Sequence, residues 1–431
     1  MTTDTGWMRN REGLGVWEHR GKVAIVGWGQ SHIDRRWDGV TMDRSCGCLS
    51  KEACLKAIAD AGLSLDDIDG LITSPDTRAE QTWAPRPFFD PPYDTEDGLT
   101  KASGEWIQKE LGFKNVKYIK SDAPYIGPQM GLAAQAVGDG LCETALVWYP
   151  MVNLEGRYGH NNPQNLTQEA PGNSAFSIPW GYQSGAMFNN AVIFLEYCKK
   201  YGTSHDALAP LAINLRRNGL MTPWGYYAMH EPYQLTREDY LNGRLVEEPL
   251  VVYDCDRPIM TCAAFIFTTA ERAKDLRQKP VYILNHCQNN IPGRSTMTTL
   301  EEQQEAVASL ARKMWEGSGL GPKDVDIFNP YDGYLTFTQN FLEAFQWHGV
   351  GLGEAHDFYA GDMRVEGPHP FLSSGGNSGV GRSRASLHSD SIEQLRGTAG
   401  ARQVTVKAEI AVAGSNTPDS CGFIMYSKTP D

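Results

Sequence analysis

Ala-Gly-Leu-Ser-Leu-Asp-Asp-Ile-Asp-Gly-Leu-Ile, residues 61–72, is the stretch of sequence that decides the fold. The segment before it, 49–61, has apolar residues at helical spacing, and Gly62 is a residue type that ends a helix. A similar stretch occurs at 318–328, where Ser-Gly-Leu is followed at the same offset by Asp-Val-Asp and an apolar run. The order of helix, glycine and strand is therefore predicted twice.

The segments around these two stretches also repeat. The apolar segment 23–26 predicts a first strand, with Gly27-Trp28-Gly29 as a tight turn after it, and 281–284 opens the later part of the chain in the same way. A helix is predicted at 307–315, before the second stretch. Later strands are predicted at 145–148 and 404–406. Each match is weak by itself, but together they indicate a duplicated half.

Strands that alternate with helices predict a mostly parallel sheet covered by helices on both faces. Residues from about 151 to 250 interrupt this alternation, because they are rich in Gly, Pro, Asn and aromatic residues and contain only local helices such as 189–201. We interpret this segment as an insertion that builds a lid or a pocket wall.

The composition argues against a nucleic-acid-binding protein. The chain has 431 residues, of which 41% are hydrophobic and 21% charged, and these are globular values. Its formal net charge is −13, and it shows no clusters of Lys and Arg for phosphates. An anionic ligand would need a local basic patch. Arg216 and Arg217 are candidates for it, although adjacent arginines also occur on solvated helix faces.

Signals for membranes and metals are missing from the sequence. No segment has the ~18 to 20 uninterrupted apolar residues of a membrane span, and the first residues lack the apolar core of a signal peptide. We therefore expect no membrane span and a cytoplasmic location. The nine cysteines are scattered through apolar segments, as in reduced proteins. Neither Cys46 with Cys48 nor the group His348, His369 and His388 has metal-site spacing, so no metal is expected.

Several motifs, in a shared order and spacing, resemble those of one superfamily. They are Tyr201-Gly-Thr-Ser204, Leu235-Thr-Arg-Glu-Asp-Tyr240, Glu248-Pro249-Leu250, Asp254-Cys255, Thr269-Ala-Glu-Arg-Ala273, Tyr331-Asp332-Gly333-Tyr334, Gly375-Gly376 and Gln394-Leu-Arg-Gly397. In these motifs the chain resembles the thiolase superfamily from residue 23 to the end. The resemblance is greatest to the sterol-carrier-protein type thiolases and to the lipid-transfer-like aldolases of bacterial steroid side-chain degradation.

The resemblance implies the thiolase fold, an α/β fold of two duplicated βαβαβαββ halves with mixed sheets in five layers, α-β-α-β-α. An N-terminal extension, 1–22, would precede a first half at 23–280 that contains the insertion at about 151–250. The second half would span 281–431. A homodimer is also implied, because thiolases pair through the central sheet.

The thiolase cysteine machinery is missing at the positions that the resemblance implies. A thiolase has its nucleophilic cysteine at the start of a buried helix, where the helix end lowers the thiolate pKa. Here that helix is predicted at 131–137, and Ala123 stands at the nucleophile position. The second cysteine is expected near Gly414, and Cys421 lies too far along the chain. Arg382 stands where the histidine of the Gly-His-Pro-type motif is expected.

Tyr331 and Asp332 stand where the sterol-carrier-protein thiolases have a His-Asp pair. The steroid side-chain aldolases share this tyrosine, and the resemblance implies that it moves the proton of a β-hydroxyl group. A tyrosine is a weak base at its usual pKa of ~10, but a nearby cation such as Arg382 would lower that pKa. Tyr125 and Tyr334 are local alternatives for the group that protonates the enolate.

The enolate oxygen of such a reaction needs hydrogen-bond donors. The glycine-rich turns predicted at Gly375-Gly376 and at Gly414 would offer backbone N–H groups, an oxyanion hole worth ~3 kcal/mol per good donor. Each candidate also has a structural interpretation. Tyr331 could be a packed loop tyrosine whose hydroxyl has a structural partner, Arg382 a surface arginine, and the glycines simple turn residues.

The resulting hypothesis is a retro-aldolase, a carbon–carbon lyase. It would cleave a β-hydroxyacyl-CoA with a bulky, steroidal β-substituent into a ketone and a short acyl-CoA, with the coenzyme A thioester as substrate and no cofactor. The resemblance also implies an OB-fold acyl-CoA-associated partner, often linked to a hydratase. The alternatives are a non-catalytic thiolase-like subunit that binds lipid or acyl-CoA within a complex, and a condensing enzyme that runs the aldol direction.

Overall fold

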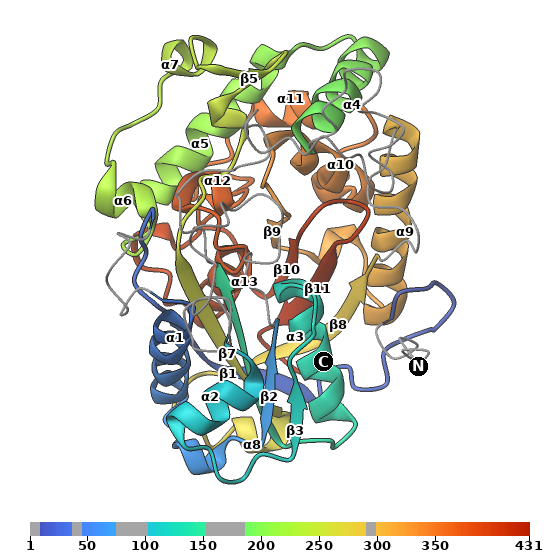
Figure 1. Cartoon of the computed structure of the whole chain (residues 1–431). Helices are drawn as coiled ribbons and strands as arrows, with labels where there is room; N and C mark the ends of the chain where they lie inside the picture. Colours follow the sequence, from blue (N-terminus) through green and yellow to red (C-terminus); the bar gives the residue numbers. More distant parts are fainter. Residues whose placement is uncertain (1–8, 37–44, 75–101, 152–185, 290–298) are drawn as a thin grey trace, which may run out of the picture.

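The computed structural model of the chain describes residues 9–36, 45–74, 102–151, 186–289 and 299–431 (Figure 1). A nine-stranded sheet lies at its centre, and β5 and β6 form a small two-stranded sheet. The strands are β1 (Val23–Gln30), β2 (Gly70–Thr73), β3 (Tyr118–Lys120), β4 (Thr144–Met151), β5 (Leu245–Glu247), β6 (Leu250–Val251), β7 (Thr261–Thr269), β8 (Val281–Gln288), β9 (Ile327–Asn329), β10 (Ile410–Ser415) and β11 (Gly422–Ser427). The α-helices are α1 (Cys46–Ala61), α2 (Gly104–Leu111), α3 (Ile126–Gly138), α4 (Ala186–Tyr201), α5 (Ala209–Leu220), α6 (Tyr226–His230), α7 (Arg237–Leu241), α8 (Ala270–Ala273), α9 (Leu300–Ser318), α10 (Leu335–Phe345), α11 (Ala355–Tyr359), α12 (Gly376–Val380) and α13 (Ser386–Arg396).

The large sheet is mixed. Its order is β3-β2-β4-β7-β1-β8-β11-β10-β9, so the strands of the early and the late part of the chain meet at β1 and β8. The pairs β2–β3, β2–β4 and β9–β10 are parallel, and the other pairs of neighbours are antiparallel. The prediction of a mostly parallel sheet was therefore wrong, and the mixed sheet implied by the thiolase resemblance is confirmed.

The predicted repeat of helix, glycine and strand is confirmed. Helix α1 ends at Gly62, which has a φ of 75°, and α9 ends at Gly319, which has a φ of 70°. Both glycines adopt the left-handed conformation that closes a helix without steric cost. A short 3-10 helix follows each of them and leads into β2 or β9. The two strands occupy equivalent places in the two parts of the sheet.

Two buried helices, α3 and α13, form the middle layer (Figure 1). Helix α3 packs against β4 on one side and against β11 and β8 on the other, and α13 packs against β10 and β9. Helix α1 covers the outer face of β1, β7 and β4, while α9 and α10 cover the other outer face. Because α3 lies between the early and the late strands, the single sheet folds into two layers around it, and the arrangement is the five-layer α-β-α-β-α thiolase fold.

The predicted turn at Gly27-Trp28-Gly29 was wrong, because β1 continues through it to Gln30. A Cβ atom on Gly27 would overlap the carbonyl oxygen of Ala57, and one on Gly29 would overlap the backbone of the same helix, α1. These glycines allow a helix to approach the strand closely, which the sequence does not distinguish from a turn.

The strand predicted at 404–406 was also wrong. Val404 lies in a loop, and its N–H donates to Oε1 of Gln394 at 3.0 Å, so this segment packs against α13. The strand begins later, at Ile410. A β-branched run that is bonded to a helix side chain cannot take part in the ladder of the sheet.

The described part of the predicted insertion, 186–250, forms helices α4 to α7 at the top of Figure 1. Helix α5 packs against α12, and a Cβ on Gly219 would overlap the backbone of Gly379. The insertion therefore touches the loop that carries the predicted glycines. Residues 152–185 of this predicted lid or pocket wall lie outside the described residues.

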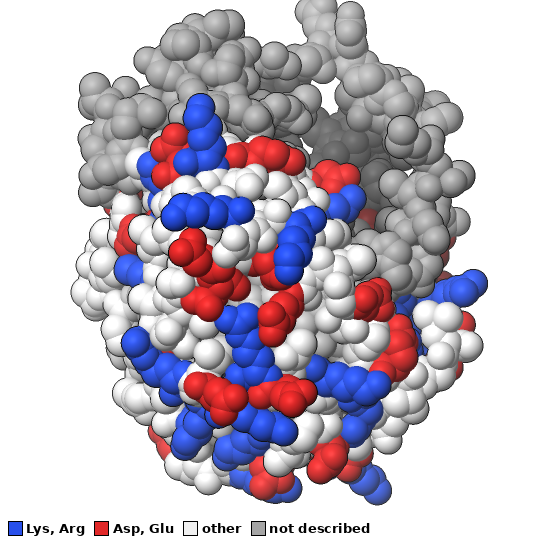
Figure 2. All heavy atoms as spheres, turned by 90° about the horizontal axis from the view of Figure 1, so that it is seen from below, with Lys and Arg blue, Asp and Glu red and all other residues white. Residues whose placement is uncertain are grey.

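Two expectations from the sequence, of a surface without a basic area for phosphates and of no membrane span, can be compared with the described residues. Figure 2 shows one face of the molecule, on which Lys and Arg alternate with Asp and Glu without a continuous basic area. Among the described residues, no helix combines the length and the apolar character needed to cross a membrane.

Candidate functional site

Tyr331 lies in the loop between β9 and α10. Its ring is 3% exposed and stacks on Phe337, with the ring centroids 6.2 Å apart. The phenol lies over Gly333, where any side chain would overlap it. Within the described part of the chain, the Tyr331 hydroxyl makes no hydrogen bond. This corrects the structural interpretation of Tyr331, which required a partner for that hydroxyl.

Asp332 caps helix α12. Its carboxylate accepts hydrogen bonds from the backbone N–H of Asn377 at 2.8 Å, from Nδ2 of Asn377 at 2.9 Å and from the N–H of Ser378 at 2.9 Å. Burial raises its pKa to about 6, although these hydrogen bonds oppose the shift. With both oxygens bonded to α12, Asp332 is a positioning residue for the loop rather than a base.

Two buried arginines follow α12. Nε of Arg382 lies 3.5 Å from the Asp256 carboxylate, and its backbone N–H donates to Arg257. Its exposed fraction is 7%, so the interpretation of Arg382 as a surface arginine was wrong. Arg384 is buried to the same extent and has a φ of 56°.

The guanidinium group of Arg384 lies between two candidate tyrosines. Its central carbon is 5.9 Å from the Tyr331 ring centroid and 5.7 Å from that of Tyr125, and Nη1 donates to the Tyr149 hydroxyl at 3.3 Å. The sequence analysis did not select Arg384. Its only signal was a second arginine two residues after Arg382.

Burial sets the protonation of the tyrosines. It raises the pKa of Tyr331, while the charges of Arg384 and then Arg382 act in the opposite direction. Burial also raises the pKa of Tyr125 and of Tyr334. Tyr331 is therefore a neutral phenol at neutral pH, beside two cations that favour its anion.

Tyr125 and Tyr334 approach the site from different elements. Tyr125 is the residue before α3 and lies within hydrogen-bonding reach of Asn416 and Ser420 in the loop after β10. Tyr334 is the residue before α10, and its ring meets the edge of Phe337 at 5.4 Å. Both stay as candidate proton donors, and Tyr125 is the one beside Arg384.

The glycines predicted to form an oxyanion hole have other roles. The N–H of Gly375 donates to Leu372 at 2.8 Å, and that of Gly376 donates to Oγ of Ser374 at 3.1 Å. Gly414 lies inside β10 opposite Phe423, so the predicted turn there was wrong. A Cβ at Gly376 would overlap Asp332, and one at Gly414 would overlap the Phe423 ring. Close packing, rather than free N–H groups, explains these glycines.

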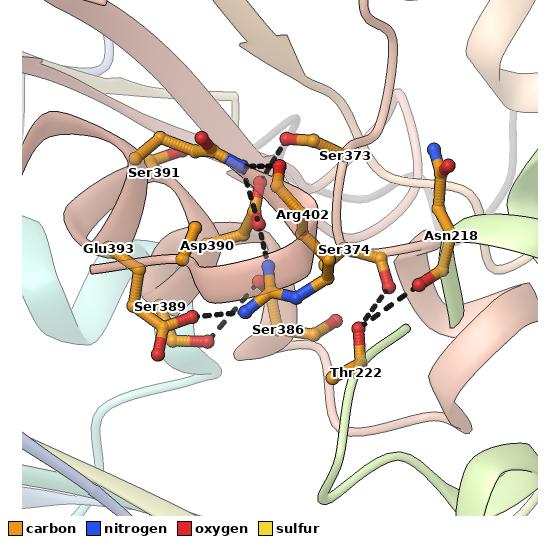
Figure 3. A network of polar contacts seen from close by, with 12 residues as sticks. Asn218, Thr222, Ser373, Ser374, Ser386, Ser389, Asp390, Ser391, Glu393 and Arg402 are labelled. Atoms are coloured by element: carbon orange, nitrogen blue, oxygen red, sulfur yellow. Dashed lines mark hydrogen bonds and ion pairs between the residues drawn. The ribbon is translucent and has the colours of Figure 1, made fainter. Parts of the chain in front are cut away.

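A buried polar network holds the loop before α12 in place (Figure 3). Thr222 donates to the carbonyl of Ser374 at 2.9 Å, and Ser373 donates to Asp390. Asp390 also accepts from Asn329, at the end of β9, at 3.1 Å. Arg402 pairs with both Asp390 and Glu393 of α13. The network therefore ties together the two loops that carry Tyr331 and Gly375.

The position predicted for the thiolase nucleophile contains no thiol. Ala123 is buried, and its N–H donates to Thr73 at 3.2 Å in the loop before α3. Cys421 immediately precedes β11, where burial holds the pKa of its thiol well above the usual value, and its Sγ contacts the carbonyl of Pro418 at 3.6 Å. Such a thiol stays protonated and is a poor nucleophile.

The longest motif of the resemblance converges on Asp254. This fully buried carboxylate accepts hydrogen bonds from the Tyr240 hydroxyl at 2.5 Å, from the His205 ring at 2.7 Å and from the Val251 N–H at 2.7 Å. Two residues later, the N–H of Asp256 donates to the carbonyl of Gly333 at 3.1 Å. Tyr240 and Asp254, which belong to the motifs, thus help to position Asp256, the partner of Arg382, next to the Tyr331 loop.

Comparisons with known proteins identify relatives of this chain. The family model "Thiolase C-terminal domain-like" matches residues 289–420. The 17-hydroxy-3-oxo-4-pregnene-20-carboxyl-CoA lyase of Mycobacterium tuberculosis is 30% identical over 419 residues, which cover 94% of this chain and 99% of that protein. A steroid side-chain-cleaving aldolase of Thermomonospora curvata is 25% identical, and the match covers 94% of this chain and 98% of that protein. The solved structure of the Ltp2-ChsH2(DUF35) aldolase superposes with a TM-score of 0.75 at 23% identity, and the match covers 94% of this chain and 98% of that chain.

Proposed function

This chain belongs to the thiolase-fold family that includes these steroid side-chain-cleaving lyases, and on that premise we propose that it is a retro-aldolase. Its substrate would be a β-hydroxyacyl-CoA with a steroid as the β-substituent. The products would be a steroid ketone and a shorter acyl-CoA. The names of the relatives support this substrate class.

The proposed reaction balances without an oxidant or a cofactor. A base removes the proton of the β-hydroxyl group, the C–O bond becomes a carbonyl, and the bond between Cα and Cβ breaks. Its electron pair forms an enolate of the thioester, which then takes a proton at Cα. Tyr331 as phenolate is the proposed base, and Tyr125 or Tyr334 the proposed acid.

The observation that carries the proposal is the free hydroxyl of Tyr331. The ring is buried, yet within the described residues the hydroxyl has no hydrogen bond, and Arg384 and Arg382 lie near enough to favour its anion. A buried tyrosine with a purely structural role normally has a partner. Tyr359 shows that case, because its hydroxyl bonds to Thr338 at 2.7 Å.

The test is the release of ketone from a steroidal 3-hydroxyacyl-CoA by wild type, Tyr331→Phe and the matched control Tyr359→Phe. We expect Tyr331→Phe to lower kcat by about 10²- to 10⁴-fold without loss of stability. Tyr359→Phe should cost about 1 kcal/mol of stability and leave kcat nearly unchanged. Equal activity of Tyr331→Phe and wild type would refute the role of Tyr331.

The pH profile gives a second readout. Because burial raises the pKa of Tyr331, only a small fraction is phenolate at neutral pH. The rate kcat/KM should therefore rise by about tenfold per pH unit above neutrality until that pKa is reached. A profile that is flat over this range would show that another group is the base.

We further propose that the enzyme works with a second component and as a homodimer. The predicted partner is an OB-fold acyl-CoA-associated protein, and the name of the solved Ltp2-ChsH2(DUF35) aldolase contains two components. Strand β3 is an edge strand of the described sheet and is the proposed dimer contact. Ketone should be measured with and without the partner, and the mass by light scattering. No ketone in either case would refute the lyase and favour a non-catalytic subunit.

A further inference from the structure

Arg384 differs from the other buried arginines of the described chain. Four of them form ion pairs, and Arg216 lies on the rings of Tyr227 and Tyr233, with its guanidinium carbon 3.5 and 4.5 Å from the two centroids. The paired arginines are Arg9 with Glu18, Arg382 with Asp256, Arg396 with Asp60 and Arg402 with Asp390 and Glu393. Among the described residues, Arg384 has no carboxylate partner, and the one hydrogen bond of its guanidinium group goes to the neutral Tyr149 hydroxyl. Its Nε is buried without a hydrogen bond, as are those of Arg216, Arg382 and Arg402.

The conformation of Arg384 is also unfavourable. A φ of 56° places its backbone in the left-handed region, which non-glycine residues rarely adopt. The backbone N–H donates to Oδ1 of Asn377 at 2.7 Å, and Asn377 is in turn held by Asp332. The loop therefore fixes a strained residue and holds a buried cation, without a carboxylate partner in the described chain, beside the rings of Tyr125 and Tyr331.

A buried cation without a counter-ion destabilises the fold. An anion that binds during the reaction would compensate this charge. The proposed reaction creates one such anion, the enolate oxygen of the thioester. The N–H groups of Gly375 and Gly376 already have partners, and Arg382 is already neutralised by Asp256. Of the two arginines after α12, Arg384 is the one without an ion pair among the described residues.

We propose that Arg384 is a catalytic residue that binds the thioester oxygen of the acyl-CoA and stabilises the enolate formed when the bond between Cα and Cβ breaks. This inference rests on the proposed retro-aldolase function. The guanidinium group donates hydrogen bonds to the oxygen and forms no covalent bond. The negative charge stays on the substrate until Cα takes a proton, and the hydrogen bond from the Arg384 N–H to Asn377 keeps the donor in place.

Arg384→Asn and Arg384→Lys test the proposal, because asparagine tolerates the left-handed conformation and lysine retains the charge. With steroidal 3-hydroxyacyl-CoA, Arg384→Asn should lower kcat by about 10²- to 10³-fold, with an unchanged or higher Tm. The kcat of Arg384→Lys should fall less than that of Arg384→Asn. Low concentrations of guanidinium should partly restore the kcat of Arg384→Asn. A kcat of Arg384→Asn close to that of wild type would overturn the proposal.

A binding measurement separates this inference from the proposed function. A saturated steroidal acyl-CoA, which lacks the β-hydroxyl group and cannot be cleaved, is labelled with ¹³C at its thioester carbonyl and bound to each protein. The carbonyl stretch should move to lower frequency on wild type and Arg384→Lys but not on Arg384→Asn. Equal frequencies in wild type and Arg384→Asn would overturn the role of Arg384 even if ketone is released. Absence of ketone with a shifted stretch would instead refute the lyase and keep the carbonyl contact. If Arg384→Asn fails to fold, an unshifted stretch on wild type overturns the proposal, and a shift that Arg384→Lys retains supports it.

Discussion

Two buried arginines of this protein lie on connected loops and have opposite surroundings. Arg402 is 2% exposed and is paired with Asp390 and Glu393, and Asp390 is bonded in turn to Ser373 and Asn329 (Figure 3). Arg384 is 7% exposed and, in the described chain, pairs with no carboxylate. The difference shows that a compensated charge organises the loops, while an uncompensated one is available for a ligand.

The largest effect on stability is expected at Arg402. Its replacement by Met leaves Asp390 as a buried carboxylate without a cation, so we expect Arg402→Met to lower the free energy of unfolding by about 3–5 kcal/mol. Urea denaturation measures this loss. The kcat of the folded fraction should fall less than the kcat of Arg384→Asn, because Arg402 acts only through the position of the loops.

The double variant Arg402→Met/Asp390→Asn is the control for this interpretation. It removes both charges, so it should be less destabilised than the sum of the two single variants. An additive result would show that the ion pair contributes nothing beyond the separate side chains.

A second prediction concerns Asp332, which is bonded to helix α12 in the segment before Arg384. Burial raises its pKa from 3.8 to about 6, so the folded protein holds this proton to higher pH than the unfolded chain does. The stability from this group is therefore complete below the unfolded pKa and is lost as the pH rises through about 6, by about 3 kcal/mol in total. Asp332→Asn removes this titration.

Wild type and Asp332→Asn should be compared by denaturation at several values between about pH 4 and pH 8. The difference in free energy of unfolding should shift in favour of Asp332→Asn as the pH rises. A constant difference over that range would show that Asp332 has an ordinary pKa in the fold.

The smallest expected effect separates backbone strain from packing in the site loop. Gly376 and Gly400 both have a φ of 61°, but a Cβ at Gly376 would overlap Asp332, whereas one at Gly400 would meet no atom within 4 Å. Gly400→Ala should cost about 1 kcal/mol, the cost of a left-handed alanine. Gly376→Ala should cost about 2 kcal/mol and also lower kcat. If thermal denaturation shows the same loss of stability for both variants, the overlap with Asp332 does not contribute at Gly376.

The sequence predicted those features that depend on neighbouring residues. The helix periodicity before Gly62 and Gly319, and the strands that follow, are local signals, and the structure confirms them. Tyr331 was selected because it stands where the sterol-carrier-protein thiolases have a histidine, and its role stays a prediction. Ala123 was selected because it aligns with the thiolase nucleophile, and the structure shows no thiol at that residue.

The features that failed depend on contacts between distant segments. Gly27 and Gly414 resemble turn residues in the sequence, and only the packed helix α1 or the ring of Phe423 explains them as strand residues. Arg384 was missed because neither its left-handed backbone nor the absence of a carboxylate near it can be read from adjacent residues. The protonated state of Tyr331 likewise follows from burial, which is a property of the whole fold.

The burial of helix α3 has a consequence for folding during synthesis on the ribosome. All residues from Ile126 to Val137 are buried, and the N–H of Gly127 donates to Oγ of Ser415, 288 residues further along the chain. The apolar surface of α3 is therefore synthesised long before the strands that cover it. A nascent chain that ends before β11 exposes this helix, so chaperones are expected to bind it until translation ends.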